Sequence, residues 1–184
     1  MRKLVKALCF AFALCLTLCT FACDVGVSRK TPTADRYFNF ELLDDGTYSI
    51  SVKDKTDIPD KVILPSKYEG YAVTQINLQG FANTAITKIA IPDGYTKICG
   101  YAFENCHDLK TIEFGNTITT FEQGAFSGCT GLVNTILIPT SVTSIGNYCF
   151  EYCTSLLVVD IPKETTLGLE VFKGCNENLT INRV

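Results

Sequence analysis

Between residues 81 and 172 a phenylalanine returns at a nearly constant interval. Its five positions are 22 to 24 residues apart: Phe81, Phe103, Phe126, Phe150 and Phe172. In four copies a cysteine follows three residues later, at Cys106, Cys129, Cys153 and Cys175, and the first copy has Thr84 in this place. Because one unit of this size cannot bury its apolar side alone, the period predicts a solenoid in which successive coils stack on one another.

Each repeat also contains a short segment with the alternation of a β-strand. In the copy at residues 109 to 114, we expect Leu109, Ile112 and Phe114 to point inward, while Thr111 and Glu113 point outward. In three copies a proline follows this segment, and its missing N–H group ends strand pairing. These prolines are Pro92, Pro139 and Pro162.

One repeat is longer than its neighbours just before its strand. The step from Cys106 to Ile112 is six residues, as is the step from Cys153 to Val159, whereas residue 129 is seven residues from residue 136. An extra residue in one strand of a sheet produces a bulge. The sequence therefore predicts a bulge near Val133 to Thr135.

The first 36 residues differ in kind from the repeats. Three basic residues precede an uncharged run from Ala7 to Ala22, and the run ends at Cys23. This order is typical of an export signal, and residues 1–22 are predicted to be one, with Cys23 as an acylated first residue of a mature lipoprotein. The alternative is an ordinary secretory signal with Cys23 incidental. Residues 23–36 are polar and without periodicity, so they are predicted to be a flexible linker.

The charge balance argues against nucleic acid as a partner. Removal of residues 1–22 takes away three positive charges and leaves 13 Lys and Arg against 19 Asp and Glu, a net charge of about −6. An acidic chain without a basic stripe lacks the electrostatic footprint of a nucleic-acid-binding protein. With 47% apolar and 19% charged residues, the rest of the chain has ample material for a continuous core.

A β-hairpin is predicted at residues 37–60, before the repeats. Two alternating runs, 38–42 and 48–52, flank an Asp-Gly pair at residues 45 and 46, which is a strong hairpin signal. We expect this hairpin to cap the open first edge of the solenoid. The solenoid itself is assigned to residues 61–184, with a partial repeat at 61–75.

The cysteines of the repeats favour a structural role. Four of them share one repeat position, so they are expected to stack in register with parallel Cβ directions, whereas a disulfide needs Cβ atoms turned toward each other. Buried free thiols are therefore preferred over a disulfide framework. His107 is the one histidine, and neither a zinc-ligand spacing nor a nucleophile–base pair accompanies it. The sequence predicts no metal, no cofactor and no enzymatic activity.

The full unit resembles a known repeat. Residues 138–156, IPTSVTSIGNYCFEYCTSL, are similar to the repeat of the BspA-like bacterial leucine-rich repeat family, I-P-x-x-V-T-x-I-G-x-x-A-F-x-x-C-x-x-L, and the likeness covers residues 60 to 184. The resemblance implies a right-handed solenoid, mainly β, with a parallel sheet on its concave face, displayed on a cell surface and used in adhesion. It carries no catalytic residue. A closing cap begins at residue 178 but stops at Val184, which leaves an edge exposed.

The outward positions of the predicted strands are the candidate ligand-binding residues. They are Lys88, Ala90, Thr111, Glu113, Thr135, Leu137, Val158 and Asp160. At a strand spacing of about 4.8 Å, five or six strands offer a strip of roughly 25 by 10 Å, smaller than the ~800 Å² that each partner buries in a stable complex. We therefore expect weak single contacts with an extracellular protein or glycan. The alternative function is a structural or assembly protein of the envelope that associates end to end.

Overall fold

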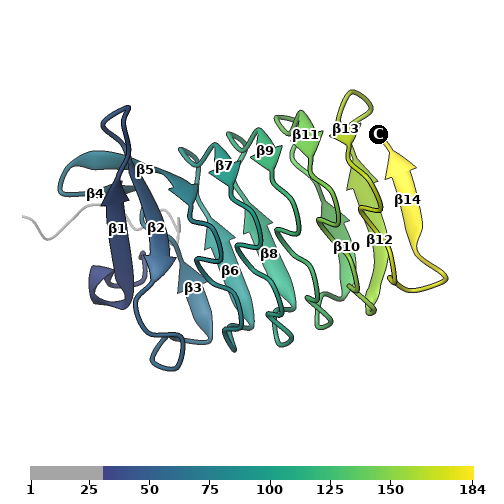
Figure 1. Cartoon of the computed structure of the whole chain (residues 1–184), viewed down its shortest axis with the longest axis horizontal. Helices are drawn as coiled ribbons and strands as arrows, with labels where there is room; N and C mark the ends of the chain where they lie inside the picture. Colours follow the sequence, from purple (N-terminus) through teal and green to yellow (C-terminus); the bar gives the residue numbers. More distant parts are fainter. Residues whose placement is uncertain (1–30) are drawn as a thin grey trace, which may run out of the picture. The chain divides into compact units, whose positions relative to one another are not determined.

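The structure is a computed structural model, and it describes residues 31–184. The predicted export signal, the lipidation site at Cys23 and most of the predicted linker lie outside the described residues. Within residues 31–184, no helix combines the length and the apolar character needed to span a bilayer. The described part is a mainly-β solenoid whose coils follow one another along a single axis (Figure 1), which confirms the predicted fold class.

An eight-stranded sheet runs along one side of the solenoid. Its order is β1-β2-β5-β7-β9-β11-β13, with β4 paired to β5. The bounds are β1 Phe38–Leu42, β2 Tyr48–Val52, β4 Lys67–Tyr68, β5 Tyr71–Ile76, β7 Lys97–Ile98, β9 Thr120–Phe121, β11 Ser144–Ile145 and β13 Thr166–Leu167. From β2 onward the strands along this path pair in parallel, one strand per coil.

The predicted repeat strands form a second side, which is divided into two three-stranded parallel sheets. The first has the order β3-β6-β8 and the second the order β10-β12-β14. The bounds are β3 Lys61–Ile63, β6 Lys88–Ile91, β8 Thr111–Phe114, β10 Asn134–Leu137, β12 Leu156–Ile161 and β14 Thr180–Arg183. The expected parallel sheet is present in two parts, because no ladder joins β8 to β10 within residues 31–184.

The predicted phenylalanine stack is confirmed. Ring centroids of successive coils are 5.3 Å apart for Phe81–Phe103, 5.2 Å for Phe103–Phe126, 5.2 Å for Phe126–Phe150 and 5.7 Å for Phe150–Phe172. The backbone holds the same register, because the Phe103 N–H donates to the Ala125 carbonyl and the Phe126 N–H to the Cys149 carbonyl, both at 2.8 Å. Stacked rings and backbone bonds thus set one spacing for all coils.

The cysteines beside the rings are free thiols, as predicted. Each thiol donates to the carbonyl of the phenylalanine one coil earlier: Cys106 to Phe81 at 3.1 Å, Cys129 to Phe103 at 3.0 Å, Cys153 to Phe126 at 3.2 Å and Cys175 to Phe150 at 3.0 Å. In the first copy the Thr84 hydroxyl donates to Phe81 of its own coil at 2.8 Å. These bonds satisfy the side chains inside an apolar core.

The backbone between strand and cysteine turns in the same way in every coil. Two positions per coil adopt left-handed φ angles between +50° and +72°, one two residues before the phenylalanine and one two residues after it. The first set is Gln79, Tyr101, Gly124, Tyr148 and Glu170, and the second is Asn83, Asn105, Gly128, Tyr152 and Gly174. A repeated turn of this kind keeps the intervening ring at one place in each coil.

The predicted hairpin is present at the start of the solenoid. Strands β1 and β2 pair in antiparallel register, and β2 continues in parallel onto β5. At the turn, the Asp45 carboxylate accepts bonds from the Thr47 hydroxyl at 2.6 Å and the Thr47 N–H at 2.9 Å. These bonds lower the pKa of Asp45, because they stabilise its charged form.

The last residues before the hairpin cover the other exposed strand edge. The Thr33 N–H donates to the Ile63 carbonyl at 2.8 Å, and the Ile63 N–H donates to the Thr33 hydroxyl at 2.9 Å. A 3-10 helix, η1, follows at Asp35–Tyr37. Residues from 31 onward therefore pack on the solenoid, which shortens the predicted linker at its C-terminal end.

Candidate functional site: a cleft between strands β8 and β10

The break in the strand face opens a cleft of about 470 Å³ between β8 and β10. Its walls are formed by Ile112, Glu113, Phe114, Asn116, Thr135, Leu137, Ile138, Pro139 and Thr140. Three of the eight predicted ligand-binding residues, Glu113, Thr135 and Leu137, are thus brought together. Thr111 is also on β8, and the other four lie on β6 and β12.

Local packing draws β8 toward the coil before it. Gly115 stands where other coils have proline, and a Cβ atom added there would lie only 2.7 Å from the carbonyl carbon and oxygen of Pro92. The loops that follow these strands are also tied together, because the Asn116 N–H donates to the Asp93 carboxylate at 2.6 Å. The close approach is possible only because residue 115 has no side chain.

The coil after the break carries the extra residue seen in the sequence. The ladder between β10 and β12 passes from the pair Asn134–Leu156 to the pair Thr135–Val158, so Leu157 has no partner. The irregularity therefore occurs within the predicted stretch, although the unpaired residue is on β12. With β8 held to the earlier coil and β10 out of step, the two strands do not join.

The cleft mixes apolar and polar surface. Ile112 and Phe114 are only partly buried, although the Phe114 ring still contacts Phe121 at 5.1 Å and Phe126 at 5.9 Å inside the core. Leu137 projects from the opposite wall and is 64% exposed. Within residues 31–184, β8 and β10 share no ladder, and a strand edge outside a ladder can accept an added peptide strand.

The predicted residues on β6 and β8 are joined by an ion pair. The Lys88 ammonium lies 2.5 Å from the Glu113 carboxylate, and both side chains are less than 40% exposed. Ala90 is only 9% exposed, so its prediction as a ligand-facing residue is wrong. Its methyl group lies in register between Ile63 and Glu113, whose longer side chains flank it.

Asp160, one of the two predicted residues on β12, also has a partner that the sequence did not suggest. The Asp160 carboxylate accepts a bond of 2.7 Å from the Asn182 side chain on β14. Asn182 lies in the last coil, where the repeat pattern is incomplete, so no motif pointed to it. Its register opposite Asp160 is visible only once β12 and β14 are paired. Asn116, Pro139 and Thr140 of the cleft were missed as well. They follow the strands, so strand alternation does not point to them.

The remaining reactive groups are engaged in structural bonds. The His107 Nδ1 atom lies 3.0 Å from the Gly128 carbonyl, which links two coils. Burial raises the pKa of Cys106, Cys129 and Cys149, and thus keeps these thiols protonated. Among residues 31–184, no group of three His, Cys, Asp or Glu side chains is placed to hold a metal ion.

These coils stack with one short parallel strand on each side, a phenylalanine ladder and a cysteine in four of the five turns. Together these features define a leucine-rich repeat solenoid. The family model for the BspA-type leucine-rich repeat region matches residues 74–183 in six copies. The chain therefore belongs to the BspA-type leucine-rich repeat family. A search of curated protein sequences gave no significant match.

Solved structures with the same fold come from several bacteria. A leucine-rich repeat protein of T. pallidum is 23% identical, with a TM-score of 0.75, and the match covers 84% of this chain and 83% of that one. One from Bacteroides ovatus is 28% identical, with a TM-score of 0.70, over 79% of this chain and 39% of that chain. A leucine-rich cell surface protein of Faecalibacterium prausnitzii is 23% identical, with a TM-score of 0.59, over 83% of this chain and 51% of that chain.

Proposed function

We propose that this protein is a non-enzymatic binding module of the cell surface, which recognises extracellular protein or glycan ligands through the faces of β6, β8, β10 and β12 and the loops beside them. The observation that carries the proposal is the cleft at the break, which places Glu113, Thr135 and Leu137 around one hollow. Membership of the BspA-type family supports an adhesive role. The F. prausnitzii neighbour, described as a cell surface protein, supports surface display.

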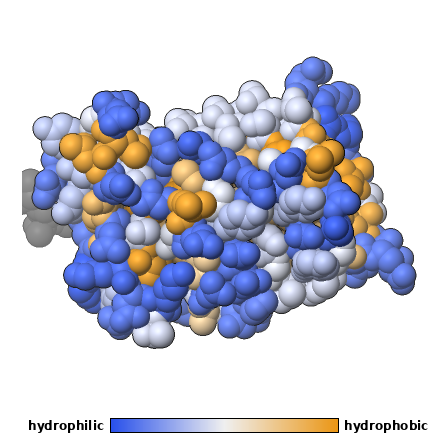
Figure 2. Space-filling view, in the orientation of Figure 1, coloured by the Kyte–Doolittle hydropathy of each residue, from blue (hydrophilic) through white to orange (hydrophobic). Residues whose placement is uncertain are grey.

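The cleft favours a protein ligand over a glycan at this site. An extended peptide segment forms backbone hydrogen bonds to an unpaired strand edge, and its side chains then enter neighbouring pockets. Here two strand edges face the hollow, and Leu137 offers an apolar contact beside them. The face of the molecule in Figure 2 shows apolar patches separated by hydrophilic residues, and such small patches suit a weak, repeated contact.

The decisive experiment changes Leu137 and a matched leucine elsewhere. Leu137→Asp should abolish capture of extracellular matrix and cell-wall proteins by residues 31–184, because it puts a charge on the cleft wall. Leu42→Asp is the control, since Leu42 is 63% exposed against 64% for Leu137 but lies on β1. Circular dichroism should show both variants folded. Undiminished capture by Leu137→Asp, or equal loss in the two variants, would refute the assignment of the cleft.

Surface display is proposed to depend on a lipid at Cys23. An acylated cysteine and a short linker would hold the solenoid outside the membrane. Metabolic labelling with a palmitate analogue in the native host should label the wild-type protein and not a Cys23→Ser variant. Equal labelling of both would exclude Cys23 as the anchor and leave simple secretion.

A second function, assembly through the last coil, is favoured by its exposed core. Phe172, Cys175 and Leu179 are only partly buried, and all four residues of β14 are exposed. The first coil is covered by the hairpin, so stacking of a last coil on a first coil is blocked. Two last coils facing each other across a twofold axis would cover both. Light scattering of residues 31–184 over rising concentration tests this, since a persistent monomer contradicts it.

A further inference from the structure

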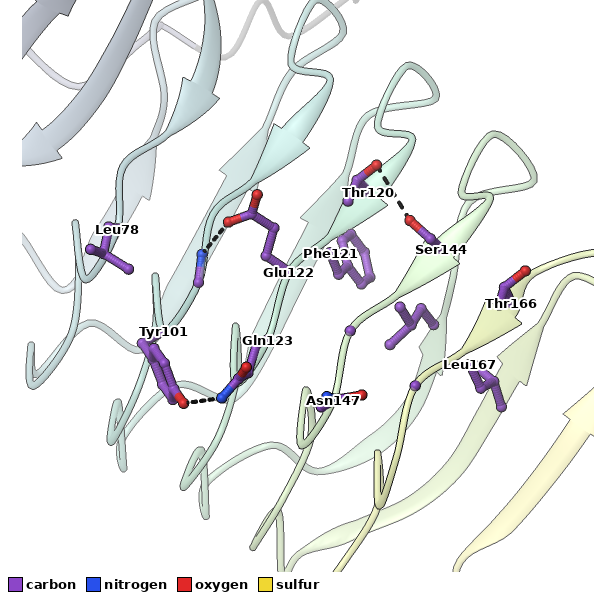
Figure 3. A pocket seen from close by; sticks show the side chains of 14 residues that line it. Leu78, Tyr101, Thr120, Phe121, Glu122, Gln123, Ser144, Asn147, Thr166 and Leu167 are labelled. Atoms are coloured by element: carbon purple, nitrogen blue, oxygen red, sulfur yellow. Dashed lines mark hydrogen bonds between the residues drawn. The ribbon is translucent and has the colours of Figure 1, made fainter.

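A second hollow lies on the eight-stranded sheet, away from the cleft. It is a groove of about 580 Å³, and its lining comes from successive coils at equivalent positions, from Leu78 in one to Gly168 in the last (Figure 3). The stacked phenylalanines give the step between coils as 5.2 to 5.7 Å. The groove therefore follows the solenoid axis, and a ligand lying in it would meet a new coil at each such step.

Two glycines that follow strands are part of the lining. Gly146 follows β11 and Gly168 follows β13. A Cβ atom at Gly146 would lie 2.5 Å from the Gln123 backbone nitrogen, and one at Gly168 would lie 2.6 Å from the Asn147 nitrogen. At these two positions the coils approach too closely for a side chain, so the lining there is backbone alone.

Apolar surface borders the groove at both ends. Leu78 is 67% exposed at one end and Leu167 is 37% exposed at the other. Between them the Tyr101 ring extends over Gly124, where a Cβ atom would come within 2.4 Å of its Cε1 atom. Figure 3 shows Tyr101 and Gln123 next to each other on this wall. Such a combination of apolar surfaces and a phenol is typical of sites for amphipathic ligands.

Apart from Glu122, the polar groups of the groove are neutral and present both donors and acceptors. The Gln123 side-chain amide donates to the Tyr101 hydroxyl, which leaves the hydroxyl proton of Tyr101 directed to another acceptor. The Asn147 side-chain oxygen accepts from the Leu169 N–H at 2.7 Å, so its NH₂ group is the part able to meet a ligand. Hydroxyls of Thr120, Ser144 and Thr166 follow along the strands.

The one charged group of the lining is already compensated. Glu122 accepts a bond from the Gly100 N–H at 2.9 Å and forms an ion pair with Lys97 at 3.1 Å. The pKa of Lys97 is raised by its hydrogen bond to Glu122, which keeps the pair charged. No lysine or arginine is among the residues that line the groove, so a polyanion finds no counter-charge there.

These features select one class of ligand. Because β7, β9, β11 and β13 are paired in sequence across the groove, an added peptide strand finds no free edge between them. A linear, uncharged glycan fits instead, since its hydroxyls both donate and accept while its ring faces are apolar. An extended β-linked glycan also repeats over a length close to one coil step. We propose that this groove binds a linear, uncharged β-linked glycan along the solenoid axis, a site separate from the cleft of the proposed function.

The test measures binding of purified neutral oligosaccharides to residues 31–184 by titration calorimetry and NMR. Cello- and chito-oligosaccharides from the disaccharide to the hexasaccharide should bind with an affinity that rises with length, because longer chains contact more coils. Tyr101→Ala and Gln123→Ala should each weaken binding about tenfold or more, the effect of losing a good polar or stacking contact. Tyr71→Ala is the matched control, because Tyr71 is 59% exposed outside the groove, and it should bind normally.

The outcomes separate this site from the cleft. Leu137→Asp should keep full glycan binding even though protein capture is lost. Failure of every neutral oligosaccharide to bind at millimolar concentration would overturn the groove assignment, as would unchanged binding by Tyr101→Ala and Gln123→Ala. Stronger binding of charged oligosaccharides, or loss of glycan binding in Leu137→Asp, would also overturn it.

Discussion

The two sides of these coils are made by the same repeats, yet only one of them keeps a single register. On the side of the rings and the eight-stranded sheet, the phenylalanine rings of successive coils stack with their centroids 5.2 to 5.7 Å apart. On the side of the repeat strands, the ladder stops between β8 and β10. The difference shows which interactions define the coil and which part of the coil is free to vary.

The continuous side is held by several interactions at every step. A stacked ring, a backbone bond and a thiol bond to the preceding coil act at nearly the same place, as in the bonds from Cys129 to Phe103 and from the Phe103 N–H to Ala125. The strand side has one ladder per step and no ring stack. Pairing on the strand side is lost at the step from β8 to β10 while the opposite side remains continuous, and the cleft lies at this break.

Phe126→Ala is expected to give the largest loss. The ring is fully buried, stacks on Phe103 and Phe150, and meets Phe121 at 5.6 Å. Truncation of such a side chain costs about 3 to 5 kcal/mol, as transfer and cavity terms add. Urea unfolding of residues 31–184 measures it. A loss below about 1 kcal/mol would show that the ladder is not what holds the coils in register.

On the strand side, the stability losses of two paired isoleucines can be compared directly. Ile89 and Ile112 pair with each other on β6 and β8, but Ile89 is fully buried whereas Ile112 borders the cleft and is partly exposed. Ile89→Ala should cost about 2 to 5 kcal/mol. Ile112→Ala should cost clearly less, because less apolar surface is removed from the core. Equal losses in urea unfolding would mean that the cleft is closed in solution.

The sequence was sufficient for the continuous side because that side is a local pattern repeated with little change. Phenylalanine and cysteine at constant spacing predict the stack, and Asp45-Gly46 predicts the hairpin turn. The break was only half predictable. The extra residue before Ile136 located an irregularity, but whether the sheet bulges or parts depends on how closely the neighbouring coil packs, as at Gly115 against Pro92.

The site residues divide in the same way. Strand alternation identified Glu113, Thr135 and Leu137, since a period of two assigns outward positions without knowledge of the fold. It failed at Ala90, because exposure also depends on the length of the flanking side chains. The groove on the eight-stranded sheet was missed altogether. Glycines after the strands at 146 and 168 were the available signal, but a hollow arises only where several coils bring such positions together.

The smallest expected effect concerns the buried thiol of Cys149. Burial raises its pKa above the ordinary value of 9.0. The folded protein therefore keeps this proton while the unfolded chain releases it, so the stabilisation is complete below pH 9.0 and is lost as the pH rises beyond that value. Each such thiol contributes a slope of about 1.4 kcal/mol per pH unit. Unfolding free energies measured on both sides of this pH should show the decline.

Replacement of Cys149 separates titration from packing. Ala102 and Ala125 occupy the same position in two other coils, so Cys149→Ala fits the local structure and should reduce the alkaline slope by one thiol. Cys149→Ser should give the same reduction in slope, although its cost at neutral pH is larger because a hydroxyl is buried in an apolar site. If the slope is unchanged in both variants, then Cys149 is accessible to water and the continuous side is less tightly closed than the ring stack indicates.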